Sequence, residues 1–400
     1  MRLLYVVRDP YPTNRPDIVT LFGEGLSARG IASDIVALRH GGLADRPAHW
    51  PGGAEHVCTP RAGALGRALG GLRNDLRALR RRRDYDGVVV RDKILTAAIA
   101  LLMRGPAPVF YWASFPMAEH DLARAAMPLG GWLRRQALRA RGALSAWLLY
   151  RWVVPRAARV FVQSDGMAQV FAARSGRTAG LVAVPMGVNP SELRGVPPTR
   201  RALPDGAPFT MMYLGSMDRD RRIDFLLDVL VALRARAPAV DWRLRLVGGA
   251  NTEPEFAWLQ ARVHALGLDA CVTMTGPVPR ARAWALAADC HVGLSAIPRG
   301  PVYDVSSPTK VLEYLAIGLP VLVNDIPDQA HVVARTGGGL CRPMRVDDFV
   351  DGVLALQADF DRYAARAHAA RGWLLAERGY DVLADHVAAV LKEATDCRER

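Results

Sequence analysis

The sequence has few cysteines and no long apolar segment. The cysteines are odd in number, scattered and never arranged as Cys-x-x-Cys; the five are Cys58, Cys271, Cys290, Cys341 and Cys397. This scarcity excludes a disulfide scaffold and a paired-cysteine zinc site, and it indicates a reducing compartment. No apolar stretch is long enough to cross a bilayer, and the short apolar run at the N-terminus predicts a first strand instead of a signal peptide. We therefore expect a cytoplasmic protein.

Acidic residues are scarce in the first half of the chain. Residues 1–200 hold 29 Lys and Arg against 14 Asp and Glu, whereas residues 201–400 hold 23 against 25. The net charge of +13 therefore comes from the first half. Such an asymmetry predicts an anionic partner for that half, which could be a membrane surface, a phospholipid-linked substrate or a nucleic acid.

Two segments carry most of this positive charge. Arg61–Arg83 has eight arginines and one acid, and Leu122–Arg159 mixes eight arginines with tryptophans and leucines. Apolar and tryptophan faces beside an arginine-rich side are typical of an interfacial membrane helix. Arginine-rich core helices would give the same pattern. The basic segments lack the interleaved aromatics of a single-strand binder and carry no nucleic-acid motif, so no nucleic-acid partner is expected.

The length and the alternation of apolar and helix-like segments predict two α/β domains. A chain of 400 residues is too long for one compact core. Strand–loop–helix–strand order begins the chain, but no Gly-x-Gly-x-x-Gly follows the first strand, so it is not a dinucleotide fingerprint. We expect an N-terminal domain at 1–195, a Pro-, Gly- and Arg-rich linker at 196–208 and a second domain at 209–375.

The stretch Val305–Asp325 predicts a loop, a helix and a buried strand. Ser306 and Ser307 are favoured N-cap types, and Pro308 suits a first helical turn. Lys310 then lies near the start of the helix and Glu313 one turn in. A helix N-terminus beside a lysine favours a phosphate group, and the carboxylate can accept hydrogen bonds from ribose hydroxyls. An ordinary amphipathic helix before a strand is the alternative.

The segment from Pro308 to Val321, P-T-K-V-L-E-Y-L-A-I-G-L-P-V, resembles the donor-site signature of GT-B glycosyltransferases, and of family 4 in particular. Glu313 matches the second of the family's two glutamates, and the first falls on Val305. The resemblance implies an α/β fold of the GT-B type, with two Rossmann-like domains facing each other across a cleft. It also implies that residues 376–400 form a helix that crosses back to the first domain.

The resemblance implies a donor site for a nucleotide-diphospho-sugar in the second domain. A glycine after a strand lets backbone amides approach a diphosphate, and arginines neutralise it. Either Arg221 or Arg222 could be the phosphate-binding residue. The residues implied for the donor are Gly215, Ser216, Arg221, Arg222, Val278, Ser307, Thr309, Lys310 and Glu313.

The resemblance also implies residues for catalysis and for the acceptor in the first domain. Ser114 stands where the family often has a histidine, Glu119 matches a frequent downstream acid, and Lys310 would help the leaving diphosphate. The residues expected on the acceptor side are Arg8, Asn14 and Arg15, in and near the loop after the first strand. Asp92-Lys93 follows another strand, at the end where open α/β sheets place ligands.

Two histidines are given structural roles instead. His120 is expected to be a cap or solvent residue, and His291, in a buried strand, a core or edge residue.

We therefore expect a glycosyltransferase that moves a sugar from a UDP- or GDP-sugar to an acceptor, a lipid-linked glycan intermediate of surface polysaccharide synthesis. The resemblance implies retention of anomeric configuration, no cofactor and no metal. Peripheral attachment to the inner face of the cytoplasmic membrane through Arg61–Arg83 and Leu122–Arg159 fits the charge asymmetry. The alternatives are a sugar-nucleotide epimerase or hydrolase of the same fold, and a basic membrane- or nucleic-acid-binding protein without catalysis.

Overall fold

The computed structural model describes residues 1–13, 15–39, 49–60, 63–103, 105–126, 131–194, 196 and 206–396. Its contacts divide the chain into two compact units: residues 1–187 with 380–400, and residues 188–379. Most of the predicted linker, 196–208, lies outside the described residues, as does Asn14. Within the described ranges no helix is both long and apolar enough to span a membrane.

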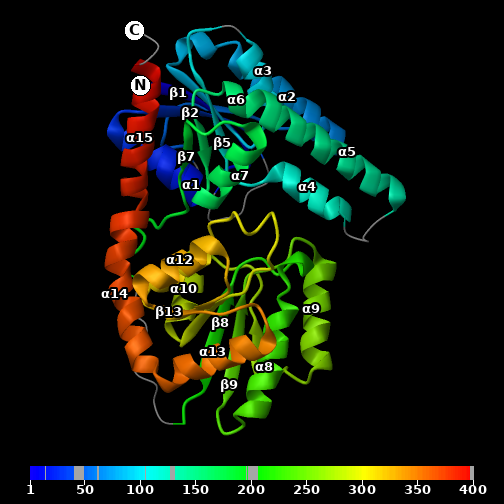
Figure 1. The fold of residues 1–400 in the computed structure, drawn as a ribbon, viewed down its shortest axis with the longest axis vertical. Coiled ribbons are helices and arrows are strands. Elements are labelled where there is room, and N and C mark those ends of the chain that lie inside the picture. Colours follow the sequence, from blue (N-terminus) through cyan, green and yellow to red (C-terminus); the bar gives the residue numbers. More distant parts are fainter. Residues whose placement is uncertain are drawn as a thin grey trace. The chain divides into compact units, whose positions relative to one another are not determined.

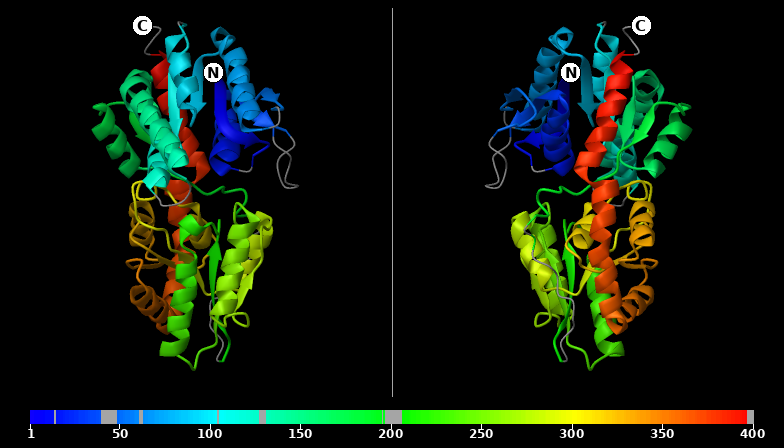
Figure 2. Two further views of the ribbon diagram at one scale, coloured as in Figure 1. Left: turned by 90° about the vertical axis from the view of Figure 1, so that its right-hand side faces the viewer. Right: turned by 90° about the vertical axis from the view of Figure 1, so that its left-hand side faces the viewer.

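The first unit is a seven-stranded parallel sheet with helices on both faces (Figures 1 and 2). The strand order is β3-β2-β1-β4-β5-β6-β7. The strands are β1 (Arg2–Tyr11), β2 (Ala32–Arg39), β3 (Glu55–Cys58), β4 (Gly87–Arg91), β5 (Val109–Ala113), β6 (Val160–Val162) and β7 (Leu181–Ala183). The helices are α1 (Pro16–Ile18), η1 (Val19–Gly25), η2 (Ser27–Arg29), α2 (Ala64–Leu79), η3 (Arg82–Asp84), α3 (Ile94–Leu102), α4 (Met117–Ala126), α5 (Trp132–Leu148), η4 (Leu149–Val153), α6 (Val154–Arg156), α7 (Asp165–Ser175) and α15 (Tyr380–Asp396).

The second unit is a six-stranded parallel sheet of order β10-β9-β8-β11-β12-β13. Its strands are β8 (Phe209–Leu214), β9 (Trp242–Val247), β10 (Val272–Met274), β11 (Val292–Ser295), β12 (Val321–Val323) and β13 (Gly339–Cys341). Its helices are η5 (Arg219–Arg221), α8 (Asp224–Arg236), α9 (Glu253–Ala265), α10 (Arg280–Ala288), α11 (Thr309–Ala316), α12 (Pro327–Thr336), α13 (Val346–Ala358) and α14 (Phe360–Arg378).

Both sheets reverse their strand order at one point. The reversal lies between β1 and β4 in the first unit and between β8 and β11 in the second. Open α/β sheets bind ligands at such a switch point, outside the carboxyl ends of the strands. Each unit therefore has one edge where a ligand is expected.

The central strands form where the sequence has short apolar runs. Every residue of β4 and β5 is buried, as befits parallel strands covered on both faces. Helix α7 begins with a side-chain cap, since the Ser164 hydroxyl accepts a hydrogen bond from the Met167 amide at 3.0 Å. Helix α15 packs on η1 of the first unit, and Arg29 of η2 pairs with Asp385 of α15 at 2.6 Å.

Sequence reasoning missed two of the four edge strands, β3 and β13. All four residues of β3 are half-buried, and β13 begins at the last of three consecutive glycines, 337–339. The first helical segment, 16–29, is an α-helical turn followed by π- and 3-10-helical turns. Neither missed strand contains an apolar run, since β3 reads Glu-His-Val-Cys and β13 reads Gly-Leu-Cys.

Candidate functional site

The candidate site of the second unit lies at its switch point. Gly215 follows β8 directly and has a φ of +143°, a conformation that side chains other than glycine's rarely adopt. A Cβ built on Gly215 would lie 3.4 Å from the Lys310 ammonium. A side chain at this position would therefore be strained and would contact the Lys310 ammonium, at the carboxyl end of β8.

Helix α11 is fixed to this edge by Tyr314. The Tyr314 hydroxyl accepts a hydrogen bond from the Leu214 amide at 2.6 Å. A Cβ on Gly293, in β11, would collide with the Tyr314 ring, so the glycine allows the helix to approach the sheet closely. This packing sets the position of Lys310 and Glu313, one turn apart on the same helix.

Lys310 lies in a confined cationic environment. Its ammonium lies 3.9 Å from the centroid of the Tyr213 ring. Burial, together with the nearby Arg221 guanidinium, lowers the pKa of Lys310 to about 7, although Glu313 opposes the shift. An incoming diphosphate would favour the charged form.

The structure distinguishes the two candidate arginines. Arg221 lies over the Tyr303 ring at 4.9 Å and close enough to Lys310 to lower the pKa of its ammonium. Arg222 ends the 3-10 turn with a φ of +54°, is 61% exposed and lies 3.7 Å from Asp224. Of the two arginines, Arg221 is therefore the one whose guanidinium acts on the Lys310 ammonium.

Glu313 is largely covered, with its side chain 18% exposed. Burial raises its pKa, although Arg280, whose guanidinium lies 3.9 Å away, opposes this. Arg280 in turn pairs with Glu192 at 2.5 Å. The carboxylate therefore has room to accept hydrogen bonds from hydroxyl groups while a neighbouring arginine favours its charged form.

Two serines predicted to bind the donor form hydrogen bonds with aspartates of the protein instead. The Ser307 hydroxyl donates to Asp328 at 2.7 Å, and Asp328 also pairs with Arg378. The Ser216 hydroxyl donates to Asp218. The expectation that Ser306 or Ser307 caps α11 was wrong. The N-cap residue of this helix is Pro308, which makes no side-chain hydrogen bond.

Thr309 and Val278 complete the predicted set. Thr309 is the first residue of α11, and its helix start carries no capping side chain. Val278 is half-buried in the loop between β10 and α10, where the Gly276 carbonyl accepts from the Gly248 amide at 3.2 Å. Their contacts with a ligand stay predictions.

An Asp-x-Asp tripeptide, Asp218-Arg219-Asp220, follows β8. The Asp218 oxygens accept hydrogen bonds from Ser216 and from the amide and side chain of Asn251 at 2.6 and 2.8 Å. This carboxylate therefore ties two loops together. Within the described residues no group of three or more His, Cys, Asp or Glu side chains is placed to hold a metal ion.

The switch point of the first unit is built around a fully buried arginine. The Arg91 side chain contacts Asp17 at 2.7 Å and Asp9 at 3.1 Å. Arg15, expected on the acceptor side, joins this network through Asp17 at 3.3 Å and Asp9 at 3.5 Å. The network fixes the loop after β1 to the end of β4.

Ser114, the residue expected near the reacting sugar, is held by Asp92. The Ser114 amide donates to the Asp92 carboxylate at 2.9 Å, and its hydroxyl donates to the other carboxylate oxygen. Asp92 has a φ of +54°, unusual for an aspartate, and burial raises the pKa of its carboxyl. Backbone strain of this kind is often found at functional sites, so Asp92 joins Ser114 as a candidate residue.

Glu119 is bound within the helical layer. One carboxylate oxygen accepts from the Tyr150 hydroxyl at 2.7 Å and pairs with Arg174. The guanidinium of Arg174 lies 4.5 Å from the Tyr150 ring centroid. This arrangement links α4, η4 and α7, and a catalytic role for Glu119 stays a prediction.

The structure places both histidines with aromatic partners. His291 is buried, accepts a hydrogen bond from the Thr210 amide at 3.0 Å and stacks on Phe209, which confirms its place in the core. His120 packs edge-on against Phe115 at 5.2 Å.

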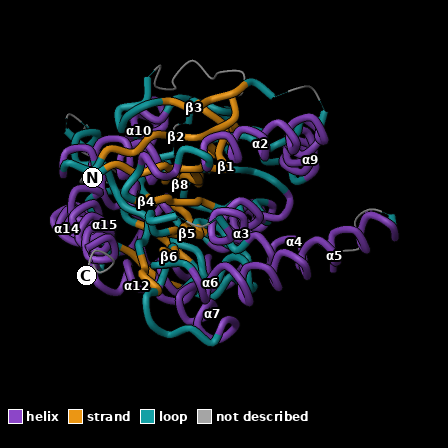
Figure 3. The backbone as a smooth tube through the Cα atoms, turned by 90° about the horizontal axis from the view of Figure 1, so that it is seen from above, coloured by secondary structure: helices purple, strands orange, loops and turns teal. Residues whose placement is uncertain are grey.

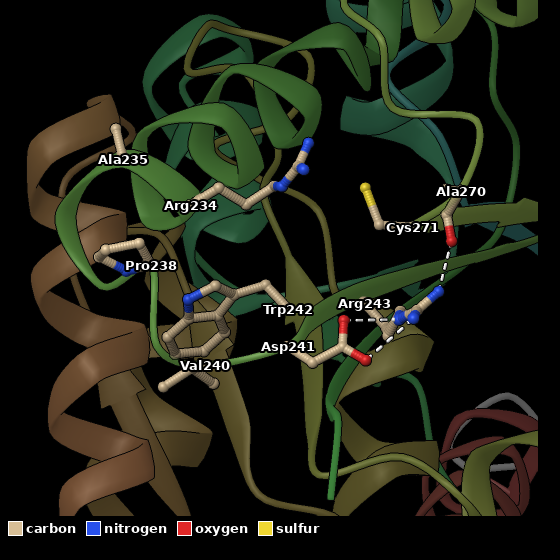
Figure 4. A pocket seen from close by; sticks show the side chains of 9 residues that line it. All are labelled: Arg234, Ala235, Pro238, Val240, Asp241, Trp242, Arg243, Ala270 and Cys271. Carbon is tan, nitrogen blue, oxygen red and sulfur yellow. Dashed lines mark hydrogen bonds and ion pairs between the residues drawn. The ribbon is translucent and has the colours of Figure 1, made fainter. Parts of the chain in front are cut away.

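Two pockets differ in their relation to these edges. A pocket of about 410 Å³ lies at the switch point of the first unit, lined by Arg8, Asp92 and Lys93 among others. A pocket of about 600 Å³ in the second unit precedes β9, at the amino edge of the sheet (Figure 4). Only the first lies where α/β sheets bind ligands.

Sequence reasoning missed Tyr213 and Arg280, which surround Lys310 and Glu313. Tyr213 lies two residues before Gly215 in β8, so its place near the loop could have been read from the strand. Arg280 comes from a helix 33 residues before Glu313, and no local pattern links the two.

Two parallel sheets with a cationic, glycine-flanked helix start at the second switch point define an α/β protein of the GT-B type. Residues 208–359 match the family model described as "Glycosyl transferases group 1", and residues 18–187 match "Glycosyl transferase 4-like domain". The chain belongs to these group 1, family 4-like glycosyltransferases.

A curated relative and two solved structures are similar to the chain. The GDP-mannose-dependent alpha-(1-6)-phosphatidylinositol monomannoside mannosyltransferase of Mycobacterium tuberculosis is 30% identical over 235 residues, 56% of this chain and 58% of the relative. The chain thus matches little more than half the length of that protein. Sucrose-phosphate synthase from Thermosynechococcus elongatus has a TM-score of 0.71 at 18% identity, covering 99% of both chains. Anabaena HepE in complex with UDP and glucose has a TM-score of 0.68 at 16% identity, and the match covers 98% of this chain and 99% of HepE. These structures show the shared fold.

Proposed function

We propose that the protein transfers a sugar from a nucleotide-diphospho-sugar, bound by the second unit, to an acceptor bound by the first. The observation that carries this proposal is the convergence of Lys310 and Arg221 beside Gly215 at the switch point of the second sheet. The GDP-mannose named for the mycobacterial relative and the UDP in the HepE structure support a GDP- or UDP-sugar donor.

The cations would stabilise the charge that develops on the leaving diphosphate. Positive groups fixed before the reaction stabilise a transition state without reorganisation. The Lys310 ammonium, the Arg221 guanidinium and the start of α11 all lie at one edge. We expect turnover without an added metal ion, with Glu313 binding the ribose hydroxyls. The resemblance to family 4 further implies retention of the anomeric configuration.

The acceptor would be a lipid-linked molecule met at a membrane surface. The solvent-exposed face of α5 is apolar over about 140° of the helix at about 100° per residue; it comprises Trp132, Leu133, Ala137, Ala140, Ala143, Leu144 and Trp147. Gln136, half-buried, is the one polar residue on this arc. Arginines flank the arc on both sides, and α5 has no acidic residue.

This arrangement is typical of a helix that lies in the interface of an anionic bilayer. Figure 3 shows α4 and α5 extending beyond the sheet of the first unit. The relative named for phosphatidylinositol monomannoside supports a phospholipid-type acceptor. By contrast, Arg82 of η3, which follows α2, is not available to a membrane, because it is buried and donates to the Ala100 carbonyl near the end of α3.

The decisive test is nucleotide release by the purified protein. With a panel of UDP- and GDP-sugars and a phosphoinositide acceptor, we expect acceptor-dependent release of UDP or GDP. Lys310→Ala should reduce kcat/KM by about 100-fold, since one charged donor to an oxyanion contributes about that much. Release that needs no acceptor would identify a hydrolase, and an isomerised donor would identify an epimerase. No turnover of any donor would refute transfer.

A further inference from the structure

The pocket at the switch point of the first unit has the composition of a site for an amphiphile. It lies between α2, α3, α4 and α5 and has a volume of about 410 Å³, within the range of about 300–1,000 Å³ usual for ligand pockets. Its lining combines four cations, three carboxylates and a group of apolar side chains. An inference from this pocket rests on the proposed function, because it concerns the acceptor of that reaction.

The cations divide into two kinds. Lys93 is held by Asp75 at 2.7 Å, and Arg141 is held by Asp121 through two hydrogen bonds. Arg8 and Arg67 are exposed, and no carboxylate in the described part of the chain pairs with either. The Arg8 guanidinium does contact the Met117 sulfur, but a thioether carries no charge. Two guanidiniums without a carboxylate partner beside a pocket are suited to a phosphate, which they can bind in a bidentate manner.

The inner end of the pocket offers an acceptor for hydroxyl groups. The Asp92 carboxylate lines it, and each of its oxygens accepts one hydrogen bond from Ser114. A carboxylate oxygen has a further lone pair for a second donor. A ligand with a phosphate at the rim of the pocket and hydroxyl groups further in would be a phosphorylated polyol.

An apolar track leads away from the pocket along α3. Leu95 lines the pocket and is 53% exposed, and Leu102, two turns later on the same face, is 63% exposed. Across the pocket, Ser145 of α5 is adjacent in sequence to Leu144, which belongs to the apolar face of that helix. The track therefore begins at the pocket and lies beside the helix proposed to enter the bilayer interface.

We propose that this pocket holds the phosphate-bearing, hydroxylated head of a membrane lipid, with Arg8 and Arg67 on the phosphate, and that the hydrocarbon chain leaves along Leu95 and Leu102. The charge distribution favours a lipid over a second copy of the protein. Two copies joined through α5 would bring together helices with four arginines each and no acid, whereas an anionic lipid surface is attracted to them.

The test uses the full chain and a soluble probe, dihexanoyl phosphatidylinositol, with binding measured by calorimetry. The double variant Arg8→Ala/Arg67→Ala should weaken binding about tenfold or more, a loss of about 1.4 kcal/mol. The charge-matched control Arg335→Ala/Arg366→Ala removes two exposed arginines of the second unit and should bind as wild type does. Equal losses in the two double variants would overturn the phosphate assignment.

The hydrocarbon chain is tested separately. Wild type should bind dihexanoyl phosphatidylinositol about tenfold more tightly than inositol 1-phosphate or inorganic phosphate. Leu95→Gln/Leu102→Gln should abolish that difference, whereas Val231→Gln/Val382→Gln, at two other exposed apolar positions, should keep it. Equal affinity of wild type for the lipid and the free head group would show a site for a water-soluble phosphate and refute the lipid.

Binding of UDP or GDP, followed by thermal shift, separates this inference from the proposed function. The Arg8 and Leu95 variants should leave nucleotide binding unchanged. Lipid binding with the expected variant pattern, but no sugar transfer, would support the pocket and refute the proposed function. Sugar transfer by the wild type, together with unchanged lipid affinity in Arg8→Ala/Arg67→Ala, would support the proposed function and refute the lipid site in this pocket.

Discussion

The ammonium of Lys310 lies 3.9 Å from the centroid of the Tyr213 ring, at the carboxyl end of the first strand of the second sheet. The ring faces a cation, as in other cation–π pairs, but it cannot replace the water or counter-ion that an ammonium prefers. With Arg221 also nearby, the free protein holds positive charge that an anionic ligand would neutralise. The predictions that follow for the second unit rest on this relationship.

Donor binding should depend on pH through Lys310. Its pKa is about 7 in the ligand-free protein, and bound diphosphate favours the protonated form, so affinity should fall as pH rises. Between about pH 6.5 and about pH 8.5 we expect a loss on the order of tenfold. Calorimetry with GDP-mannose or UDP-glucose measures it, because their diphosphate diesters do not titrate in this range.

The control for this pH dependence is Lys310→Arg, which stays charged over the whole range. Its affinity should vary little with pH, even if it is lower than that of wild type. A wild-type profile as flat as that of the arginine variant would show that the ammonium does not titrate near neutral pH.

Arg221 and Arg222 should differ in their effect on the donor. Arg221→Ala should weaken donor binding by about 1.5–3 kcal/mol, the range for a hydrogen bond to a charged group. Arg222→Gly should leave binding unchanged and preserve or raise stability, since residue 222 has a φ of +54° that glycine adopts without strain. Donor affinity and thermal unfolding of both variants provide the comparison. A larger loss in the Arg222 variant would contradict the assignment.

Lys310→Met should stabilise the ligand-free protein. The pKa of Lys310 falls from its ordinary 10.5 to about 7 on folding, so between these values the unfolded state binds more protons and wild-type stability rises with pH. Replacing the amine removes this penalty, and the gain should be largest below about pH 7 and vanish above about pH 10.5. Each kcal/mol should raise Tm by about 2–4 °C.

The same variant provides its own functional control. Lys310→Met should show no increase in Tm on addition of UDP or GDP, whereas wild type should show one. If the variant is less stable than wild type at neutral pH, the confined ammonium is not a source of strain.

Sequence alone predicted the parts of the fold that depend on local pattern. The βα alternation, the buried central strands and the helix–strand pair at 309–323 follow from short apolar runs, periodicity and glycine. The edge strands β3 and β13 were missed, because Glu-His-Val-Cys and Gly-Leu-Cys contain no apolar run. The cap of α11 was wrong, because Ser307 bonds to Asp328, twenty-one residues later.

The residues of the candidate site also divide into those that local sequence predicts and those that only the folded structure brings together. Lys310 and Glu313 share a helix, so their spacing was visible in the sequence, and Gly215 was found as the glycine that ends a strand. The choice between Arg221 and Arg222 depends on backbone geometry at the turn, which the residue types do not encode. Arg280, Tyr213 and the Asp92–Ser114 pair come together only through the packing of separate elements.

The buried network of the first unit should control its stability in acid. Burial alone would raise the pKa of Asp17, but Arg91 and Arg15 hold it below its ordinary value of 3.8. Because the carboxyl is more acidic in the folded state, the ion pair stabilises the fold at pH values above about 4, and this contribution is lost as pH falls through the folded-state pKa. Asp17→Asn should remove the dependence and destabilise the first unit by about 3–5 kcal/mol at neutral pH, since it breaks a buried pair. Hydrogen exchange of peptides from β1 and β4 reports on this unit specifically.

The matched control is Asp385→Asn. This substitution removes the partner of Arg29 at a site where the aspartate is 71% exposed, and it should destabilise the fold by less than about 1 kcal/mol. Equal effects of the two substitutions would show that Arg91 does not depend on its buried carboxylate.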